Sequence, residues 1–357
     1  MKILVLWSHN SGYLHECLDS LSQVADVTGV FFLPSDDSPF DRDMFQTASY
    51  STFWLNPTSE TSVNNVFNSI RKLSPDLCLV SGWHHNFYIQ YLTDHLKNSC
   101  VNVLCFDWQW QPTLRNYVKA AYGLLFRSRL FQAAFICGER QYQFARRIGF
   151  QASQIYHGLY AANPLTFTPV EWAKRSDSVA FVGRLVDSKG CEDLVQAWRS
   201  LYDSDLISSR WHLDIYGTGP FSEALSSLPN TCMHGFTQPK DLSKQISRSK
   251  ILCAPSREEP WGLQIHEASS AGLAIIATHA CGSAVHLVRS RFNGELIPAS
   301  QPSSLASAML RLIMMDDGDK SGLETYSKNS RSMSFQYTPQ IWSDTVLKMF
   351  SDSVFTF

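Results

Sequence analysis

The stretch KILCAPSREEPWGLQIHEASSAGLAIIATH, residues 250–279, places two short apolar runs on either side of a helix-length segment. The runs 250–256 and 273–279 have the length of buried strands, and residues 263–270 predict a short helix. Two neighbouring strands joined through a helix form a βαβ unit, in which the strands run parallel. This stretch therefore predicts an α/β fold.

The same alternation of apolar runs and helix-length segments continues along the chain. Helices are predicted at 14–23, 139–149 and 190–201. Further strands are predicted at 2–8, 24–33, 76–83, 101–107, 133–138, 178–183, 211–217 and 231–236. We expect two doubly wound, Rossmann-like domains that face a central cleft, with a ligand at the carboxyl ends of the strands.

The length of 357 residues exceeds what one hydrophobic core usually holds. Residues 163–177 contain two prolines and many polar residues, a composition typical of a linker. We therefore expect an N-terminal domain at 1–165 and a C-terminal domain at 166–335. Residues 336–357 are expected to form a helix that packs back toward the N-terminal domain.

The composition excludes several classes of protein. A hydrophobic content of 44% argues against disorder, and a net charge of −2 gives no reason to expect a nucleic-acid partner. The nine cysteines include no Cys-x-x-Cys pair, which indicates buried thiols in a reducing compartment. The first apolar run is too short for a signal peptide, and no stretch of about eighteen apolar residues is present. We expect a cytoplasmic protein.

Two cations flank a glycine turn and a helix start in FVGRLVDSKG, residues 181–190. Lys189 at the beginning of a helix opposes the helix dipole, unless an anion lies there as well. The guanidinium fork of Arg184 and the point charge of Lys189 together suit a diphosphate near Gly183. Two surface cations beside a turn remain the alternative interpretation.

The turn REEPWG and the helix after it carry two carboxylates. Gly262 lets the backbone approach a ligand, and the helix start at Leu263 offers N–H groups to a phosphate. Glu259 lies in the turn, and Glu267 lies about one turn into the helix, roughly 6 Å along its axis. The pair is suited to accept hydrogen bonds from a ribose and a second sugar. The alternative is a solvated turn acid and a helix-surface glutamate.

Five segments, taken together, resemble the donor half of GT-B glycosyltransferases, and most closely glycosyltransferase family 4. They read FVGRLVDSKGCEDLVQAW, LDIYGTGP, HGF, CAPSREEPWGLQIHEASSAGLAIIAT and NGELIP, and they lie between residues 178 and 300. Glu259 and Glu267 match the two glutamates, separated by seven residues, that mark family 4. Where many members have Gly-Gly-x-Pro-Glu, this chain has GSAVH at 282–286, which loosens any inference about that loop.

The resemblance implies a retaining glycosyltransferase that moves a sugar from a nucleotide-diphosphate sugar to a glycan, lipid-linked or small-molecule acceptor, with no further cofactor. It implies that Arg184 and Lys189 hold the diphosphate. The other donor roles implied are Glu267 on the ribose, Glu259 on the transferred sugar, Gly262 and Leu263 on phosphate, and Phe236 and Thr237 near the base. Two alternatives stay open: a non-catalytic nucleotide-sugar-binding partner, and a GT-B enzyme of another outcome such as an epimerase.

No convincing metal site is present in the sequence. The two Asp-x-Asp strings, Asp41-Arg42-Asp43 and Asp203-Ser204-Asp205, lie in polar loop-like or helix-end contexts. We interpret both strings as solvated surface and expect metal-independent transfer, with Arg184, Lys189 and a helix N-terminus stabilising the leaving diphosphate.

The acceptor side is expected at strand ends in the N-terminal half. Asp107 follows a strand and is a candidate active-site group, although it is equally suited to cap the next helix. His84 and His85 follow another strand, where packing is the alternative role. His9 and Gly12 lie in the loop after the first strand, a place for an acceptor or phosphate contact.

Residues 111–150 carry seven basic residues against one acid, Glu139. This segment contributes +6 to a chain of net charge −2, so the remainder carries −8. Interspersed with apolar residues, such a segment is suited to an anionic membrane or a lipid-diphosphate acceptor. A solvated basic helix face is the alternative.

Overall fold

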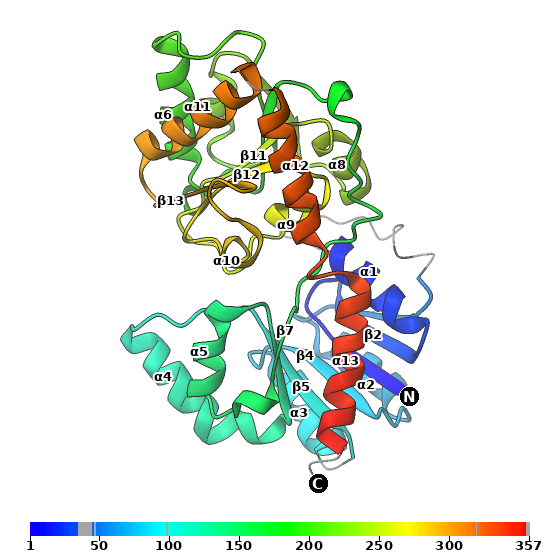
Figure 1. Cartoon of the computed structure of the whole chain (residues 1–357). Coiled ribbons are helices and arrows are strands. Elements are labelled where there is room, and N and C mark those ends of the chain that lie inside the picture. Colours follow the sequence, from blue (N-terminus) through cyan, green and yellow to red (C-terminus); the bar gives the residue numbers. More distant parts are fainter. Residues whose placement is uncertain (35–44, 46–47, 98, 319, 355–357) are drawn as a thin grey trace. The chain divides into compact units, whose positions relative to one another are not determined.

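The computed structural model describes residues 1–34, 45, 48–97, 99–318 and 320–354, and it divides the chain into two compact units. Unit 1 consists of Met1–Ala161 and Pro339–Phe357, and unit 2 consists of Ala162–Thr338. Each unit is built around one parallel sheet with helices on both of its faces (Figure 1). The prediction of two doubly wound α/β domains is thereby confirmed.

Unit 1 contains a seven-stranded sheet in the order β3-β2-β1-β4-β5-β6-β7. Its strands are β1 Lys2–Leu6, β2 Asp26–Phe32, β3 Ser51–Leu55, β4 Leu77–Ser81, β5 Val101–Phe106, β6 Ala133–Ile136 and β7 Ile155–His157. Its α-helices are α1 Gly12–Ser22, α2 Glu60–Ile70, α3 Asn86–Tyr91, α4 Leu114–Tyr122, α5 Glu139–Arg147 and α13 Pro339–Val354. Shorter helical turns are η2 Leu92–Leu96, η3 Gly123–Arg127, η4 Ser128–Leu130 and η5 Ala152–Gln154.

Unit 2 contains a six-stranded sheet in the order β10-β9-β8-β11-β12-β13. Its strands are β8 Ser178–Val182, β9 His212–Tyr216, β10 Thr231–Gly235, β11 Ile251–Ala254, β12 Ala274–Thr278 and β13 Gly294–Ile297. Its α-helices are α6 Cys191–Asp203, α7 Ser222–Ser226, α8 Pro239–Ile246, α9 Leu263–Ser270, α10 Ala284–Leu287, α11 Pro302–Gly318 and α12 Lys320–Ser334. Two short 3₁₀ turns, η6 Trp172–Lys174 and η7 Asp187–Lys189, precede β8 and α6.

Alternate residues of each central strand enter different core layers. In β11, Ile251 and Cys253 pack with the α6 and α11 side of the sheet, whereas Leu252 and Ala254 pack with the α9 side. All four side chains are at most 2% exposed. Burial on both faces explains why the central strands read as continuous apolar runs instead of an alternating pattern.

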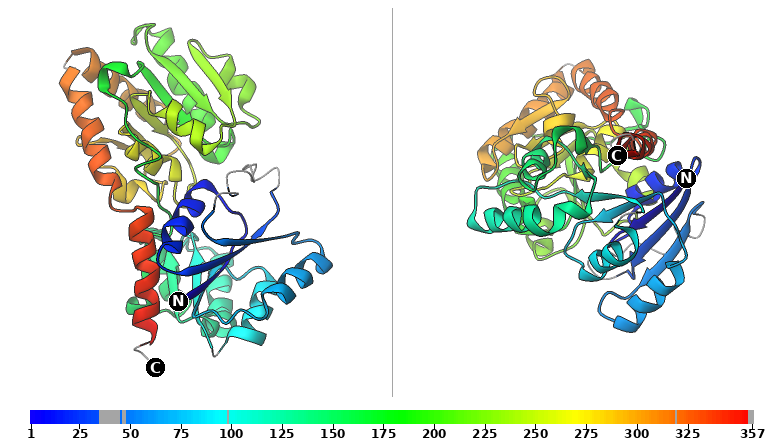
Figure 2. Two further views of the ribbon diagram at one scale, coloured as in Figure 1. Left: turned by 90° about the vertical axis from the view of Figure 1, so that its right-hand side faces the viewer. Right: turned by 90° about the horizontal axis from the view of Figure 1, so that it is seen from below.

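The last helix returns to unit 1. Helix α13 packs against α1, and both views in Figure 2 place it beside the start of the chain. Trp342 anchors it, because this indole is 1% exposed and donates from Nε1 to the carbonyl oxygen of Leu159 at 3.0 Å. The end of the chain therefore contributes to the core of the unit in which the chain begins.

The segment expected to be a linker packs closely onto unit 2. Phe167 is 3% exposed, and Arg175 is 8% exposed. The Arg175 guanidinium donates to the carbonyl oxygens of Ser249 at 2.9 Å and Ala271 at 2.7 Å. Most of this proline-containing stretch is therefore part of unit 2 and not a mobile spacer.

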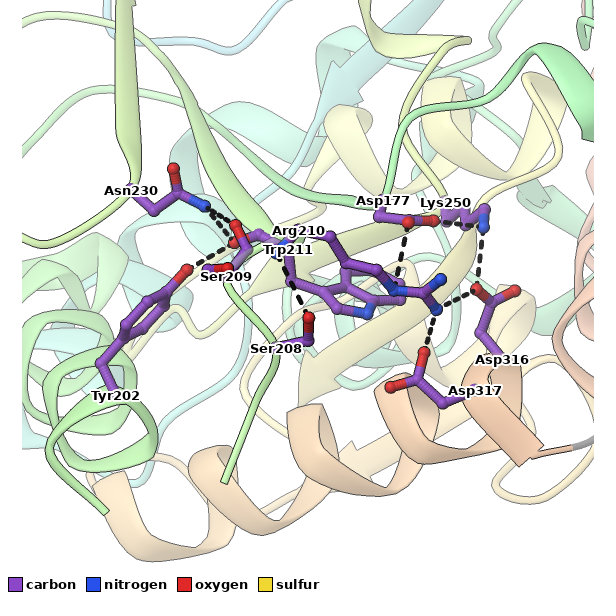
Figure 3. A network of polar contacts seen from close by, with 10 residues as sticks. All are labelled: Asp177, Tyr202, Ser208, Ser209, Arg210, Trp211, Asn230, Lys250, Asp316 and Asp317. Atoms are coloured by element: carbon purple, nitrogen blue, oxygen red, sulfur yellow. Dashed lines mark hydrogen bonds and ion pairs between the residues drawn. The ribbon is translucent and has the colours of Figure 1, made fainter. Parts of the chain in front are cut away.

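A polar network joins the amino-terminal edge of the unit 2 sheet to the end of α11 (Figure 3). Lys250, which precedes β11, donates to Asp316 at 2.8 Å and also bonds to Asp177, which precedes β8. Arg210 contacts the same two carboxylates and Asp317. Because Lys250 is only 8% exposed and Asp316 3%, each buried charge requires its partner. The network braces the sheet at the edge opposite the loops described below.

The strand order reverses direction between β1 and β4 in unit 1, and between β8 and β11 in unit 2. In doubly wound sheets, ligands bind at the carboxyl ends of the strands at such a switch point. The loops that follow β8 and β11 approach each other very closely in unit 2. Gly190 has φ +72°, and a Cβ there would lie 2.1 Å from the carbonyl oxygen of Pro255.

A pair of glycine substitutions measures this close approach. Gly190→Ala and Gly235→Ala introduce the same left-handed strain, because the φ angles are +72° and +71°. A Cβ at Gly235 meets nothing within 4 Å. We expect Gly235→Ala to lower the free energy of unfolding by about 1–2 kcal/mol, and Gly190→Ala by clearly more. Urea denaturation of both variants measures the difference, and equal losses would contradict the proximity of the two loops.

Candidate functional site

The loop after β8 is held against the turn after β9 by glycines. The amide of Gly183 donates to the carbonyl oxygen of Tyr216, and that of Leu185 to Thr218, both at 2.9 Å. A Cβ on Gly217 would lie 1.9 Å from the carbonyl oxygen of Gly183, so no larger residue fits. The turn Gly217-Thr218-Gly219 therefore serves close backbone packing. It leaves Arg184 exposed at the edge of the sheet.

The turn after β11 is fixed by two neighbouring segments. The amides of Arg257 and Glu258 donate to the carbonyl oxygen of Ser188, at 2.8 and 3.1 Å. On the other side, the carbonyl oxygen of Glu259 accepts from the amide of Gly282 at 3.1 Å. A Cβ on Gly282 would lie 2.0 Å from the carbonyl oxygen of Pro260. The backbone that carries Glu259 is therefore determined from both sides.

These two loops bring Lys189 and Glu259 into a direct ion pair, in which Lys189 Nζ donates to Glu259 Oε2. The two side chains are 17% and 9% exposed. Gln264 Nε2 lies 3.4 Å from the same carboxylate oxygen. The sequence analysis assigned the two residues to different groups of a ligand, Lys189 to the diphosphate and Glu259 to the transferred sugar. In the structure the two side chains pair with each other.

Arg257, which the sequence analysis did not single out, locks the two loops together. Its guanidinium contacts Asp193 at 2.9 and 3.1 Å, Glu192 at 3.3 Å, and Asp187. Asp193, followed by the effects of the other carboxylates, raises the pKa of Arg257 above its ordinary value. Glu192 and Asp193 lie in the first turn of α6, where carboxylates also complement the helix dipole. The sequence gives no signal for this long-range pairing.

The start of α9 is also positioned by a glycine. Gly262 precedes the helix with φ +93°, and its carbonyl oxygen accepts from Ser283 Oγ at 2.9 Å. Leu263 and Glu267 are both half-buried, and their four-residue spacing places them on the same face of the helix. Ile265, His266 and Ala268 are fully buried. Glu267 therefore lies on the partly exposed face of α9, together with Leu263 at the start of the helix.

The expected base-binding residues follow β10, at the same edge of the sheet as the loops after β8 and β11. Phe236 is 44% exposed, and Thr237 Oγ1 donates to the carbonyl oxygen of Gly235 at 3.4 Å. Because β10, β8 and β11 run parallel, all the predicted donor-binding residues of unit 2 lie on loops or helix starts at one edge.

Unit 1 contains a cavity of about 290 Å³ at its own switch point, between the loops after β1, β4 and β5. His9, His84 and Asp107 line it, together with Trp7, Ser8, Ser11, Tyr13, Ser81, Gly82, Cys105, Phe106, Trp108, Leu159 and Tyr160. Tyr160 donates to Asp107 Oδ2 at 3.1 Å. Asp107 does not cap the next helix, because Thr113 accepts from the amide of Asn116 and is the N-cap of α4.

The other two acceptor-side candidates lie outside the cavity lining. Gly12 is the first residue of α1. His85 Nε2 lies 3.2 Å from Ser8 Oγ, which faces the cavity. Burial lowers the pKa of His84, and burial together with His84 and His9 lowers the pKa of His85 to about 4. These imidazoles are therefore neutral near pH 7.

Only one of the two Asp-x-Asp strings lies in the described part of the chain. Asp41-Arg42-Asp43 lies outside the described residues. Asp203 ends α6, and Asp203, Ser204 and Asp205 are all exposed, in agreement with a solvated helix end. Within the described part of the chain, no cluster of three or more His, Cys, Asp or Glu side chains is arranged to hold a metal ion.

His266, between the two glutamates, provides a prediction about stability and pH. It is fully buried and donates from Nε2 to the carbonyl oxygen of Ser334 at 3.1 Å, and burial lowers its pKa to about 4. The unfolded chain takes up this proton near pH 6.5, so stability is fully present above pH 6.5 and is lost as the pH falls toward 4. His266→Gln should reduce the pH dependence of the unfolding free energy in this window by up to about 1.4 kcal/mol per pH unit.

Denaturant titrations from pH 7 to 4.5 check this expectation. His95→Gln is the matched control, because His95 is exposed. An unchanged slope in His266→Gln would show that the buried imidazole does not drive the loss of stability in acid.

Residues 166–332 match the model of the family described as glycosyl transferases group 1. An exopolysaccharide phosphotransferase of Streptomyces coelicolor is 24% identical over 236 residues, 64% of this chain and 24% of that protein. An uncharacterized glycosyltransferase of Methanocaldococcus jannaschii is 25% identical over 142 residues, 38% of this chain and 35% of that protein. The matches thus cover about a quarter to a third of the length of these curated relatives.

Solved structures agree with the fold over nearly the whole chain. The Anabaena protein HepE, in complex with UDP and glucose, superposes with a TM-score of 0.77 at 14% identity, covering 98% of this chain and 99% of that one. The sucrose-phosphate synthase of Thermosynechococcus elongatus gives a TM-score of 0.72 at 16% identity, covering 98% and 97%. The chain has the GT-B fold, and its residues 166–332 match the model of the glycosyl transferases group 1 family.

Proposed function

We propose that this protein is a glycosyltransferase that moves a sugar from a nucleotide-diphosphate sugar to an acceptor hydroxyl, with retention of anomeric configuration and without a metal ion. One observation carries the proposal. The loops after β8 and β11 bring two cations and two carboxylates to the switch point of unit 2, which is where a doubly wound sheet binds its ligand. The family match supports it, because it covers the same residues.

The donor diphosphate is assigned to Arg184, Lys189 and the N–H groups at the start of α9. Arg184 is exposed and offers a bidentate fork, and the left-handed Gly262 opens the helix start to an anion. Lys189 is held beside this position by Glu259. A bound diphosphate gives Lys189 a second anion to contact, so the site is charged and ordered before the donor arrives.

The two glutamates are assigned separate roles in this proposal. Glu267 shares the open face of α9 with Leu263 and is placed to accept from ribose hydroxyls. Glu259 contacts the transferred sugar, whose anomeric carbon becomes positive as its bond to the phosphate oxygen breaks. Phe236 and Thr237 lie near the base. HepE was solved with UDP and with UDP-glucose, which makes UDP the first nucleotide to test.

The chemical step exchanges one bond at the anomeric carbon. The bond from carbon to the diphosphate oxygen breaks, a bond to the acceptor oxygen forms, and the proton of the acceptor hydroxyl passes to the leaving diphosphate. Negative charge accumulates on the leaving diphosphate, where Arg184 and Lys189 stabilise it more strongly than in the ground state. This charge stabilisation takes the place that a metal ion has in other transferases.

The acceptor is assigned to the cavity of unit 1 and to a neutral polyol. Its lining contains no lysine or arginine, and Asp107 is the only carboxylate there. His84 and His85 have lowered pKa values and carry no charge near pH 7. Tyr13, Trp108 and Tyr160 offer aromatic faces, while serine and imidazole groups offer hydrogen bonds. A sugar finds both kinds of contact in such a cavity.

Isosteric substitutions separate the two glutamates by role. Glu267→Gln should weaken the binding of UDP, because it reduces acceptance of the ribose hydrogen bonds. Glu259→Gln should not weaken UDP binding, because it releases Lys189, but it should slow UDP release from UDP-glucose. Calorimetry with UDP and a coupled assay of UDP release measure both effects. Loss of UDP binding in Glu259→Gln alone would reverse the two roles.

A matched pair of acceptors tests the charge of the unit 1 cavity. A neutral phenyl glucoside should be used about tenfold better than the corresponding glucuronide, because the latter brings a second carboxylate within roughly 6 Å of Asp107. Asp107→Asn should narrow this preference, whereas the exposed Asp203→Asn should leave it unchanged. A panel of acceptors scored by product mass provides the measurement. Equal use of both glycosides by the wild-type protein would contradict the assignment.

A further inference from the structure

Helix α4 and the π-turn η3 expose an apolar stripe to solvent. The sequence LRNYVKAAYGLL, residues 114–125, repeats large apolar side chains at the three- and four-residue spacing of one helix face. In a globular protein such a stripe normally faces the core. Here it faces outward, with exposed fractions of 82% for Leu114, 62% for Val118 and 60% for Leu125. Tyr117, Tyr122 and Leu124 complete the exposed stripe, which we call the α4 ridge.

The inward face of the helix fixes this orientation. Ala120 is 6% exposed, and a Cβ on Gly123 would lie 2.5 Å from the Trp83 ring. Lys119 places its Nζ 3.7 Å above the ring of Trp108. Small residues and one cation over an aromatic ring therefore face the core. The helix cannot rotate to bury its apolar stripe without losing these contacts.

The ridge is a concentrated feature and not scattered surface apolarity. Six of the sixteen large hydrophobic side chains exposed in the described residues lie within 114–125, and the other ten are dispersed over the rest. Contiguous exposed apolar surface of this kind marks an interaction site.

Arg147 borders the α4 ridge, and further cations lie on α4 and α5. Arg147, from α5, lies 4.2 Å from the centre of the Trp110 ring, and Trp110 contacts the Tyr117 ring at 5.0 Å. Arg115 and Arg146 are exposed nearby in sequence. The only acid between residues 111 and 150 is Glu139. The surface therefore combines an apolar ridge with a positive border.

We propose that the α4 ridge rests on an anionic lipid bilayer, with its apolar side chains in the headgroup region and its arginines on lipid phosphates. The charge pattern selects this occupant. Anionic headgroups attract the arginine border, and the acyl boundary accepts the ridge. A second copy of the same surface would bring like charges together. No helix of the described residues is both long and apolar enough to cross a membrane, so the contact is with one face of the bilayer.

Vesicle sedimentation tests the proposal with the full chain. Phosphatidylcholine vesicles containing about 30% phosphatidylglycerol should sediment the protein at low salt, and pure phosphatidylcholine should not. Raising the salt should weaken the binding, because the cations contribute through screened attraction. Replacing Arg146 and Arg147 together with Gln should lower the partition coefficient about fivefold for each charge removed.

Leu114→Glu and Leu165→Glu form the matched pair for the ridge, because the two leucines are 82% and 84% exposed. Leu114→Glu should lower partitioning about tenfold, and Leu165→Glu should leave it unchanged. Unchanged thermal unfolding and UDP affinity would show that both variants are folded. Equal binding to neutral and anionic vesicles, or equal effects of the two variants, would overturn the proposal. So would a dimer in solution that Leu114→Glu dissociates without any vesicle binding by the wild-type protein.

Discussion

The ion pair between Lys189 and Glu259 is the interaction on which the loops of unit 2 depend. It joins the loop after β8 to the turn after β11, the two neighbouring strands at which the sheet order reverses. Glu259 is only 9% exposed, so its carboxylate requires a cation at this place. Removing one partner from a buried pair typically costs about 3–5 kcal/mol. Two further contacts hold the same two loops at the distance that the ion pair requires. They are the close approach of Gly190 to Pro255 and the ion pairs of Arg257.

In the proposed function, this arrangement prepares the site before the donor binds. A lysine left alone in a half-buried crevice would lose hydration without compensation. Pairing with Glu259 holds Lys189 in place, while Arg184 stays exposed at the outer edge. Gly217 and Gly282 supply backbone proximity that no other residue would allow. Electrostatic preorganisation of this kind is what the transfer of a charged leaving group requires.

Much of the fold could be predicted from the sequence, for a physical reason. The ten predicted strands are all present, because central strands of a parallel sheet are buried on both faces and read as apolar runs. The three unpredicted strands, β3, β7 and β13, are all edge strands, and they are short or half-exposed. The prolines and polar residues of 163–177 are typical of a linker. The packing of this segment depends on Arg175, whose hydrogen-bond partners lie some 75 to 95 residues away in the sequence.

The sequence predicts where the candidate residues lie along the chain but not how they pair. Local spacing placed Lys189 at a helix start and Glu259 in a turn. Their mutual contact depends on two strands lying side by side, which no local pattern encodes. The ion pairs of Arg257 could not be predicted for the same reason. The apolar spacing of α4 predicts a helix, but only the packing of Gly123 and Lys119 reveals that the apolar side faces outward.

The most direct test is a double-mutant cycle on UDP affinity with Lys189→Met and Glu259→Gln, measured by calorimetry. If Lys189 contacts the bound diphosphate in addition to Glu259, Lys189→Met should weaken UDP binding by about 1.5–3 kcal/mol, the size of a lost charged hydrogen bond. Glu259→Gln should then improve UDP binding in the presence of Lys189 and have no effect in the Lys189→Met background. Unchanged UDP affinity in Lys189→Met, in a protein that remains folded, would contradict the account.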